Sequence, residues 1–325
     1  MKILVTGGMG LIGHNVVARL EALGHDVVIA DTRTTYGIIP QDELNYLMDE
    51  RLKKIKTHFI FPIDISIKNM TFLIDSHRPD IVMHLASFPR QKVVNNNPQL
   101  GSKTMSEGLL NLLEASVQAK VKRFMYISSS MVYGDFTDDV TEDYDCKPQG
   151  QYGIMKYAGE LLVKDYTRKY GMAHTIIRPS AVYGPLDVED RVIAKFMLQA
   201  MRGQTLKVNG PDETLDFTFS TDAAHGMVAA ALSENAMNKT YNITKSHSRT
   251  LLDAAQLAVK IVGKGSIEVR GKDADFPSRG ALNISAARRD FGFDPKIDVE
   301  EGFQKYYEWI KGSSYWQAKL NTNDK

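Results

Sequence analysis

The chain has little cysteine, no long apolar run and no excess of either charge. Its single cysteine, Cys146, excludes an internal disulfide and a cysteine-rich zinc site, and fits a reducing, cytoplasmic location. No uncharged apolar stretch approaches the ~18 residues of a membrane span, and the run Ile3–Val5 is too short for a secretory signal. A formal net charge of +1 argues against a nucleic-acid partner. The eight histidines lack metal-ligand spacing, so no metal is expected.

The first 180 residues alternate short apolar runs with longer amphipathic ones, which predicts a doubly wound parallel α/β sheet. Strands are expected at residues 3–5, 27–30, 59–61, 81–85, 124–127 and 175–177, and helices at 11–23, 109–118 and 157–170.

Beyond about Pro185 the spacing becomes irregular, with turn signals at 209–211 and 276–277. We expect residues 1–180 to form one domain and 181–325 to form mainly a smaller α+β lobe, with some chain returning to the first core. A helix is expected at 299–310, and the polar tail after Lys319 is expected to fray.

A glycine-rich segment, Thr6–Gly13, follows the first expected strand and opens a helix, which favours a Rossmann dinucleotide-binding loop. Gly7 would permit the tight turn, Gly10 would let the backbone approach a pyrophosphate, and Gly13 would let the helix pack against the sheet. The free N–H groups at the helix N-terminus would face the phosphates. The spacing is Gly-x-x-Gly-x-x-Gly rather than Gly-x-Gly-x-x-Gly, so a glycine-rich turn without a ligand remains an alternative.

Asp31 ends the second expected strand, where a carboxylate can accept hydrogen bonds from the adenosine ribose. It would repel the extra phosphate of NADP, so NAD is the expected cofactor. Arg33 could tolerate that phosphate, which keeps NADP as the alternative. Asp64, after the third strand, would lie near the adenine or be a plain surface carboxylate.

Tyr152 and Lys156 lie one helical turn apart. A nearby ammonium lowers the pKa of a phenol, which could then take a proton from a substrate hydroxyl while hydride leaves for a nicotinamide. Three further Tyr-x-x-x-Lys pairs occur in the chain, so the spacing alone decides nothing. The position is more informative, because this helix follows the strand that ends in Ser128–Ser130, and ligands bind at the carboxyl ends of parallel strands.

The chain resembles the NAD-dependent epimerase/dehydratase family, the extended branch of the short-chain dehydrogenases. The resemblance rests on six segments in the family's order: Thr6–Gly13, His84–Ser87, Ser128–Gly134, Tyr152–Lys156, Arg178–Pro185 and Phe291–Pro295. It implies a Rossmann domain with a C-terminal substrate lobe, and usually a homodimer built on the helices around 100–118 and 152–170. It also assigns the catalytic serine to Ser129, beside Tyr152 and Lys156.

Two further sets of residues are expected around the reacting groups. The cofactor set is Gly7, Gly10, Leu11, Ile12, Gly13, Asp31, Arg33, Asp64, Ile65, Leu85, Ala86, Ser87, Tyr152 and Lys156. The substrate set is Ser87, Arg90, Ser130, Met131, Ser180, Arg191 and Arg279. His84 is expected to be a core histidine and Tyr183 to be structural.

Residues near the predicted site narrow the chemistry. Sugar 4,6-dehydratases resemble one another in placing Asp-Glu after the catalytic threonine, and nucleotide-sugar decarboxylases place a glutamate at the position of Met131. This chain has Ser130-Met131 there, and methionine cannot transfer a proton, so both classes are disfavoured. Reductase–epimerases usually use NADP, against which Asp31 argues.

Two departures from the family pattern affect the substrate. Leu215 stands where many nucleotide-sugar epimerases have an arginine that binds the diphosphate. Arg191 or Arg279 could replace that arginine, and Lys207 is a weaker candidate. Alternatively, each of the two arginines could be a solvated surface cation. Met105 stands where relatives commonly carry an asparagine. The helix kink that the asparagine supports in those relatives is therefore expected to be arranged differently in this chain.

Three functions follow as hypotheses. The first is a nucleotide-sugar epimerase that oxidises the sugar at the 4-position and reduces it again with the same NAD. The second is an NAD-dependent dehydrogenase of a sugar or small hydroxy compound that releases the keto product, a reading that Leu215 motivates. The third is a non-catalytic NAD sensor or scaffold, against which the intact serine, tyrosine and lysine argue.

Overall fold

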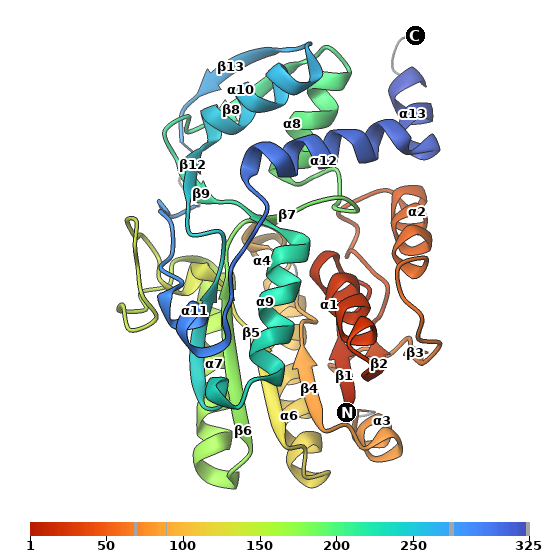
Figure 1. Ribbon diagram of the computed structural model, residues 1–325, viewed down its shortest axis with the longest axis vertical. Helices are drawn as coiled ribbons and strands as arrows, with labels where there is room; N and C mark the ends of the chain where they lie inside the picture. Colours follow the sequence, from red (N-terminus) through yellow and green to blue (C-terminus); the bar gives the residue numbers. More distant parts are fainter. Residues whose placement is uncertain (68–69, 89, 273–275, 323–325) are drawn as a thin grey trace.

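The computed structural model describes residues 1–67, 70–88, 90–272 and 276–322. A seven-stranded sheet lies at its centre in the order β11-β6-β5-β4-β1-β2-β3, with every neighbouring pair parallel (Figure 1). The strands are β1 Lys2–Thr6, β2 Asp26–Ala30, β3 Ile60–Phe61, β4 Ile81–His84, β5 Arg123–Ile127, β6 Ala173–Pro179 and β11 Lys239–Ile243. The order 3-2-1-4-5-6 is that of the Rossmann fold, so the predicted fold class is confirmed.

Helices cover both faces of the sheet. In and around this domain they are α1 Leu11–Ala22, α2 Gln41–Leu52, α3 Met70–His77, α4 Gln91–Asn96, α5 Pro98–Ser102, α6 Gly108–Gln118, α7 Gly150–Tyr170 and α9 Ser220–Leu232. Strand β1 explains the two layers, because its side chains alternate between the faces. Ile3 and Val5 pack with α1 and α9, whereas Leu4 packs with α3, α6 and α7.

The second half of the chain contributes to both cores. Strand β11 and helix α9 complete the central sheet, while the remaining elements pack as a separate cluster beyond the carboxyl ends of the strands (Figure 1). Those elements include α8 Val192–Met201, α10 Leu251–Val262, α12 Val299–Gly312 and α13 Ser314–Asn321. Helix α11, Ser285–Phe291, instead lies against β11 and α9. The short strands are β7 Val182–Tyr183, β8 Thr205–Asn209, β9 Thr214–Asp216, β10 Thr218–Phe219, β12 Ser248–Thr250 and β13 Ser266–Arg270.

The expectation of a frayed tail after Lys319 is wrong as far as Asn321, where α13 ends. The Ser313 hydroxyl accepts a hydrogen bond from the Trp316 N–H and so caps the helix, and the Trp316 side chain is buried. The end of that expected tail, 323–325, lies outside the described residues.

Helix α2 bridges the two parts of the molecule. Its Tyr46 ring stacks on Tyr315 of α13 with centroids 4.4 Å apart, and its hydroxyl lies 2.7 Å from the Ser313 hydroxyl. Its Asp42 carboxylate lies 2.7 Å from the Lys319 ammonium. Glu43 of the same helix is 2% exposed and accepts a hydrogen bond from the Glu189 N–H at 2.8 Å.

We predict that Glu43 makes stability fall as pH rises. Burial raises the pKa of Glu43 from 4.5 to about 7. The protonated carboxyl group therefore contributes its full stabilisation of the folded protein below the pKa of the unfolded state, and this stabilisation is lost as pH rises through the pKa of the folded state. The loss amounts to about 3 kcal/mol at most. Glu43→Gln keeps the acceptor for Glu189 and cannot ionise. The variant should match the wild type in denaturant unfolding at about pH 5 and exceed it at about pH 8; equal pH slopes would contradict the assignment.

Candidate functional site

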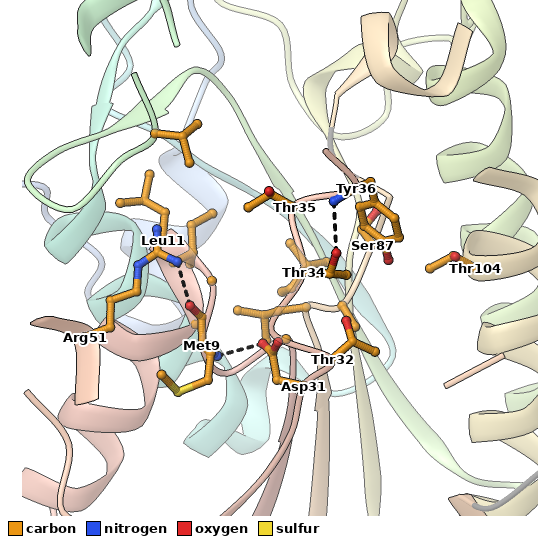
Figure 2. A pocket seen from close by; sticks show the side chains of 18 of the residues that line it. Met9, Leu11, Asp31, Thr32, Thr34, Thr35, Tyr36, Arg51, Ser87 and Thr104 are labelled. Atoms are coloured by element: carbon orange, nitrogen blue, oxygen red, sulfur yellow. Dashed lines mark hydrogen bonds between the residues drawn. The ribbon is translucent and has the colours of Figure 1, made fainter. Parts of the chain in front are cut away.

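Two adjoining cavities open at the carboxyl ends of the strands, where the two parts of the molecule meet. The first, of about 300 Å³, is shown in Figure 2, and the second measures about 460 Å³. Four residues line both cavities: Arg90, Val182, Asp187 and Arg191. A ligand in either cavity would therefore lie next to a ligand in the other.

The first cavity is built on the glycine loop. Gly7 has a φ of +72°, and a Cβ on it would lie 2.6 Å from the Ala86 nitrogen. A Cβ on Gly13 would lie 2.0 Å from the Gly7 carbonyl oxygen. Only glycine fits at these two positions, and the resulting close packing opens the α1 N-terminus to the cavity, as a pyrophosphate requires.

Asp31 is fixed at the wall of this cavity. One carboxylate oxygen accepts a hydrogen bond from the Met9 N–H at 2.9 Å, a contact drawn in Figure 2, and the other accepts from the Arg33 N–H at 2.7 Å. Burial raises the pKa of Asp31, and these two backbone donors oppose that effect. Each oxygen keeps a lone pair for a ribose hydroxyl. The Arg33 side chain is exposed and does not line the cavity, so the structure does not place it as a phosphate ligand.

The cavity gathers most of the expected cofactor set. The members that line it are Gly7, Gly10, Leu11, Ile12, Gly13, Asp31, Asp64, Ile65, Leu85, Ala86 and Ser87. The cavity is also lined by residues that the sequence analysis did not predict, among them Thr32, Thr34, Thr35, Tyr36, Arg51, Thr104 and Asp187. The polar run directly after Asp31 is a sequence signal that could have located the first four. Nothing local in the sequence marks Arg51 or Asp187, which reach the cavity only through the tertiary fold.

Ser129 and Tyr152 both line the second cavity. The Ser129 hydroxyl accepts a hydrogen bond from the Met131 N–H at 3.2 Å at the start of a short 3₁₀ turn, and it is hydrogen-bonded to Tyr152. The Lys156 side chain is buried one turn along α7, donates to the Ile127 carbonyl oxygen at 2.8 Å, and lies 5.8 Å from the Tyr152 ring centroid. Serine, tyrosine and lysine are thus brought together, although Lys156 lines neither cavity.

Two cations from the second half of the chain act on Tyr152. Burial raises its pKa, and the effects that oppose burial come from the Arg191 cation, the hydrogen bond with Ser129 and the Arg279 cation, in that order. Burial lowers the pKa of Lys156 to about 7. The cations of Arg191 and Arg279 therefore favour the phenolate.

The expected substrate set divides between the cavities. Those lining the second are Arg90, Ser130, Met131, Arg191 and Arg279, together with Leu215 and Lys207. Ser87 lines only the first, and Ser180 lies buried behind Ser130, with 3.2 Å between their hydroxyl oxygens.

The arginines of the second cavity have different partners. Arg90 is paired with Asp190 at 2.7 Å. Burial and the nearby Arg191 lower the pKa of Arg279 to about 10, and its Nε has no partner among the described residues. Such a cation favours an anion in the cavity.

Met105 lies in a π-helical turn, Lys103–Glu107, which provides the irregularity that an asparagine would otherwise support. Its side chain packs with Phe88 and Tyr152.

Two structural expectations are confirmed. His84 is buried 2.7 Å from the Thr6 hydroxyl, with its pKa lowered to about 3 by burial, and Tyr183 packs among Phe217, Phe219 and Phe303.

Within the described ranges, none of the helices combines the length and apolarity needed to cross a membrane. No group of three or more His, Cys, Asp or Glu side chains in the same part of the chain is arranged to hold a metal ion.

A glycine loop at β1, a carboxylate at the end of β2 and a Ser-Tyr-Lys group beyond β5 define a dinucleotide-dependent enzyme of the extended short-chain dehydrogenase/reductase type. The model of the NAD-dependent epimerase/dehydratase family matches residues 3–244, and the chain belongs to that family, whose cofactor is NAD.

Three relatives illustrate its range. The chain is 27% identical over 327 residues to the uncharacterised UDP-glucose epimerase YtcB of Bacillus subtilis, covering 98% of this chain and 100% of that protein. It is 29% identical over 351 residues to the dTDP-glucose 4,6-dehydratase of Neisseria meningitidis, covering 98% and 96%. The solved UDP-glucuronic acid 4-epimerase of Bacillus cereus, in complex with UDP-glucuronic acid and NAD, is 27% identical with a TM-score of 0.87, covering 96% of this chain and 99% of that one.

We predict that Arg191→Gln moves the pH dependence of turnover to higher pH. Removing the cation that most strongly opposes burial raises the pKa of Tyr152 further, so the deprotonated phenol appears only at higher pH. The measurement is the acidic limb of kcat/KM against pH. Lys195→Gln is the control, because Lys195 lines the same cavity but is not among the groups that act on Tyr152. An unmoved limb in Arg191→Gln, or an equal shift in both variants, would be inconsistent with this role.

Proposed function

We propose that the protein is an NAD-dependent nucleotide-sugar epimerase that inverts the sugar at its 4-position through a keto intermediate. The observation that carries the proposal is the arrangement of the second cavity: Ser129 and Tyr152 line it together with Arg191 and Arg279, and it adjoins the dinucleotide cavity. A hydroxyl next to the first pair and a diphosphate next to the second pair describe a nucleotide sugar. Two of the similar proteins are named as UDP-sugar epimerases.

The residues of the first cavity fit NAD. The α1 N-terminus and the cradle made by Gly7 and Gly13 would hold the pyrophosphate, and Asp31 would accept hydrogen bonds from the adenosine ribose. When bound, NAD supplies the site that accepts hydride from the sugar carbon and returns it. We assign the binding of NAD to residues 1–180 and that of the substrate mainly to residues 181–325, β11 excepted.

The chain's own residues handle the proton. Ser129 would donate a hydrogen bond to the reacting oxygen and orient it, and Tyr152 would take the hydroxyl proton as the carbon–oxygen bond becomes a carbonyl. Return of the proton from Tyr152 to the carbonyl oxygen completes the cycle. Lys156 would hold this end of α7 through the Ile127 carbonyl and would contact the nicotinamide ribose.

The side chains beside Ser129 distinguish this proposal from elimination of water. Elimination of water would require an acid and a base at the positions of Ser130 and Met131. Both residues line the second cavity, but neither side chain carries an acid or base group suited to this role. Similarity alone does not separate the two reactions, since the dehydratase relative is as similar as the epimerases. The local chemistry does favour an epimerase.

We assign the diphosphate to Arg191 and Arg279 in place of the arginine missing at Leu215. Leu215, on β9, lines the same cavity but offers no donor. The Arg279 Nε has no partner among the described residues, and Arg191 uses only part of its guanidinium on the Val182 carbonyl and Asp187. Leu215 is also the one feature that favours the second candidate, a dehydrogenase that releases its keto product.

An assay of the protein as purified separates the two candidates. UDP-glucose and UDP-glucuronic acid are the first substrates to test, because similar proteins are named for them. Exchange between 4-epimers without added NAD and without net NADH absorbance is expected. Stoichiometric accumulation of NADH with a keto product would reject the epimerase. Tyr152→Phe should lower turnover by a factor of about 10² or more with NAD affinity nearly unchanged, and turnover equal to wild type would refute its role.

We also propose that the protein is a cytoplasmic homodimer built on α6 and α7. These helices pack side by side and expose Leu110, Ile154 and Leu161 at 37%, 52% and 51%. Ile154 and Leu161 are seven residues apart, so they share one face of α7. Light scattering should give twice the chain mass for the wild type and a lower mass for Leu161→Glu. A monomeric wild type at micromolar concentration would exclude this dimer. Cys146 is free, which fits a reducing compartment.

A further inference from the structure

Arg51, at the end of α2, holds the glycine loop of the first cavity and the segment from Leu186 to Arg191, which lines both cavities. Its Nη1 donates to the Met9 carbonyl oxygen of the glycine loop at 2.8 Å, a bond visible in Figure 2, and its Nη2 donates to the Leu186 carbonyl oxygen at 2.6 Å. The side chain is 4% exposed. A buried guanidinium with two fixed acceptors cannot follow a movement of one without disturbing the other.

Leu186 occupies a backbone conformation that a leucine rarely adopts, with a φ of +69°. Such a conformation is strained for a residue with a side chain and persists only where surrounding contacts hold it. Here the Leu186 side chain is 3% exposed and packs with Ile39, Leu44 and Leu47, all in or just before α2. The hydrogen bond from Arg51 then fixes its carbonyl.

Two of the residues that line both cavities, Asp187 and Arg191, follow Leu186. The Asp187 carboxylate is 4% exposed; one oxygen accepts from the Val188 N–H at 2.9 Å and the other lies 3.6 Å from the Arg191 Nε. Arg191 also donates to the Val182 carbonyl oxygen at 3.1 Å. The position of the Arg191 guanidinium in the substrate cavity is therefore set by the segment Leu186–Arg191, and that segment is set by α2.

We propose that Arg51 is a positioning residue that couples the two cavities: through Met9 and Leu186 it links the order of the glycine loop to the position of Arg191. A dinucleotide that fixes the glycine loop would lower the cost of ordering Leu186–Arg191, and so strengthen the binding of an anionic nucleotide there. The coupling is reciprocal, so that nucleotide would strengthen the binding of the dinucleotide by the same factor. The inference rests on the proposed function in taking a nucleoside diphosphate as the ligand of the second cavity.

The test uses UDP as the probe and the affinity for NAD as the readout. Protein depleted of dinucleotide is titrated with NAD in the absence and in the presence of saturating UDP. We expect UDP to tighten NAD binding at least about fivefold in the wild type. Arg51→Lys keeps the positive charge but has a single nitrogen, which cannot bond both carbonyls in the same geometry. In this variant we expect the ratio to fall to near one.

Two further variants make the test specific. Arg202→Lys is the matched control, because the Arg202 side chain is only 12% exposed and pairs with Glu189 of the same region at 2.7 Å, but it lines neither cavity. Its ratio should equal that of the wild type. Leu186→Gly suits the positive φ and removes the packing on α2, so it should lower the ratio even if Arg51→Lys does not fold.

The results for the inference and for the proposed function are distinguishable. Wild-type protein that binds UDP with no effect on the affinity for NAD would overturn the coupling and leave the proposed function standing. A ratio retained in Arg51→Lys, or in Leu186→Gly where Arg51→Lys does not fold, would also overturn it. Wild-type protein that does not bind UDP in either state would exclude a uridine nucleotide as the ligand of the second cavity, and would overturn this inference for UDP without deciding the reaction.

Discussion

The whole arrangement depends on how closely helix α1 approaches the first turn of the sheet. The Gly7 carbonyl occupies the space in which any side chain at position 13 would lie, and Gly7 itself leaves no room beside Ala86. This contact brings the helix N-terminus to the carboxyl ends of the strands, where Asp31, Ser129 and the start of α7 also arrive. The site is a consequence of parallel strands ending at one edge.

The sequence predicted the parts of the site that are encoded locally. Strand–helix alternation, the glycine loop, Asp31 and the serines after β5 each have a signal within a few residues. The six expected strands lie at their apolar runs, whereas β11 was not predicted. The parts it did not predict depend on long-range packing. Arg51 reaches the first cavity from the far end of α2, and Asp187, from the second half of the chain, is buried near Arg51 and Arg191. Neither has a neighbour in sequence that marks it.

The electrostatics show the same division. The Tyr152–Lys156 spacing marks the lysine as a neighbour of the phenol, but nothing in it points to Arg191 and Arg279. These two cations from the second half of the chain oppose the effect of burial on the pKa of Tyr152. Spacing along a helix gives proximity, whereas the balance of charge depends on the elements packed over it. The second half of the chain thus influences the pKa of a tyrosine that lies in the first half.

The π-helical turn at Lys103–Glu107 constrains how the chain can change in length. A π-turn holds one residue more than an α-helical turn, so the face that α6 presents is rotated by about 100° from that of an uninterrupted helix. Leu109, Leu112 and Leu113 face the sheet in this rotated frame. Deletion of a single residue here would turn that apolar face toward solvent, so insertions and deletions between α5 and α6 have to arise together with a shifted hydrophobic pattern.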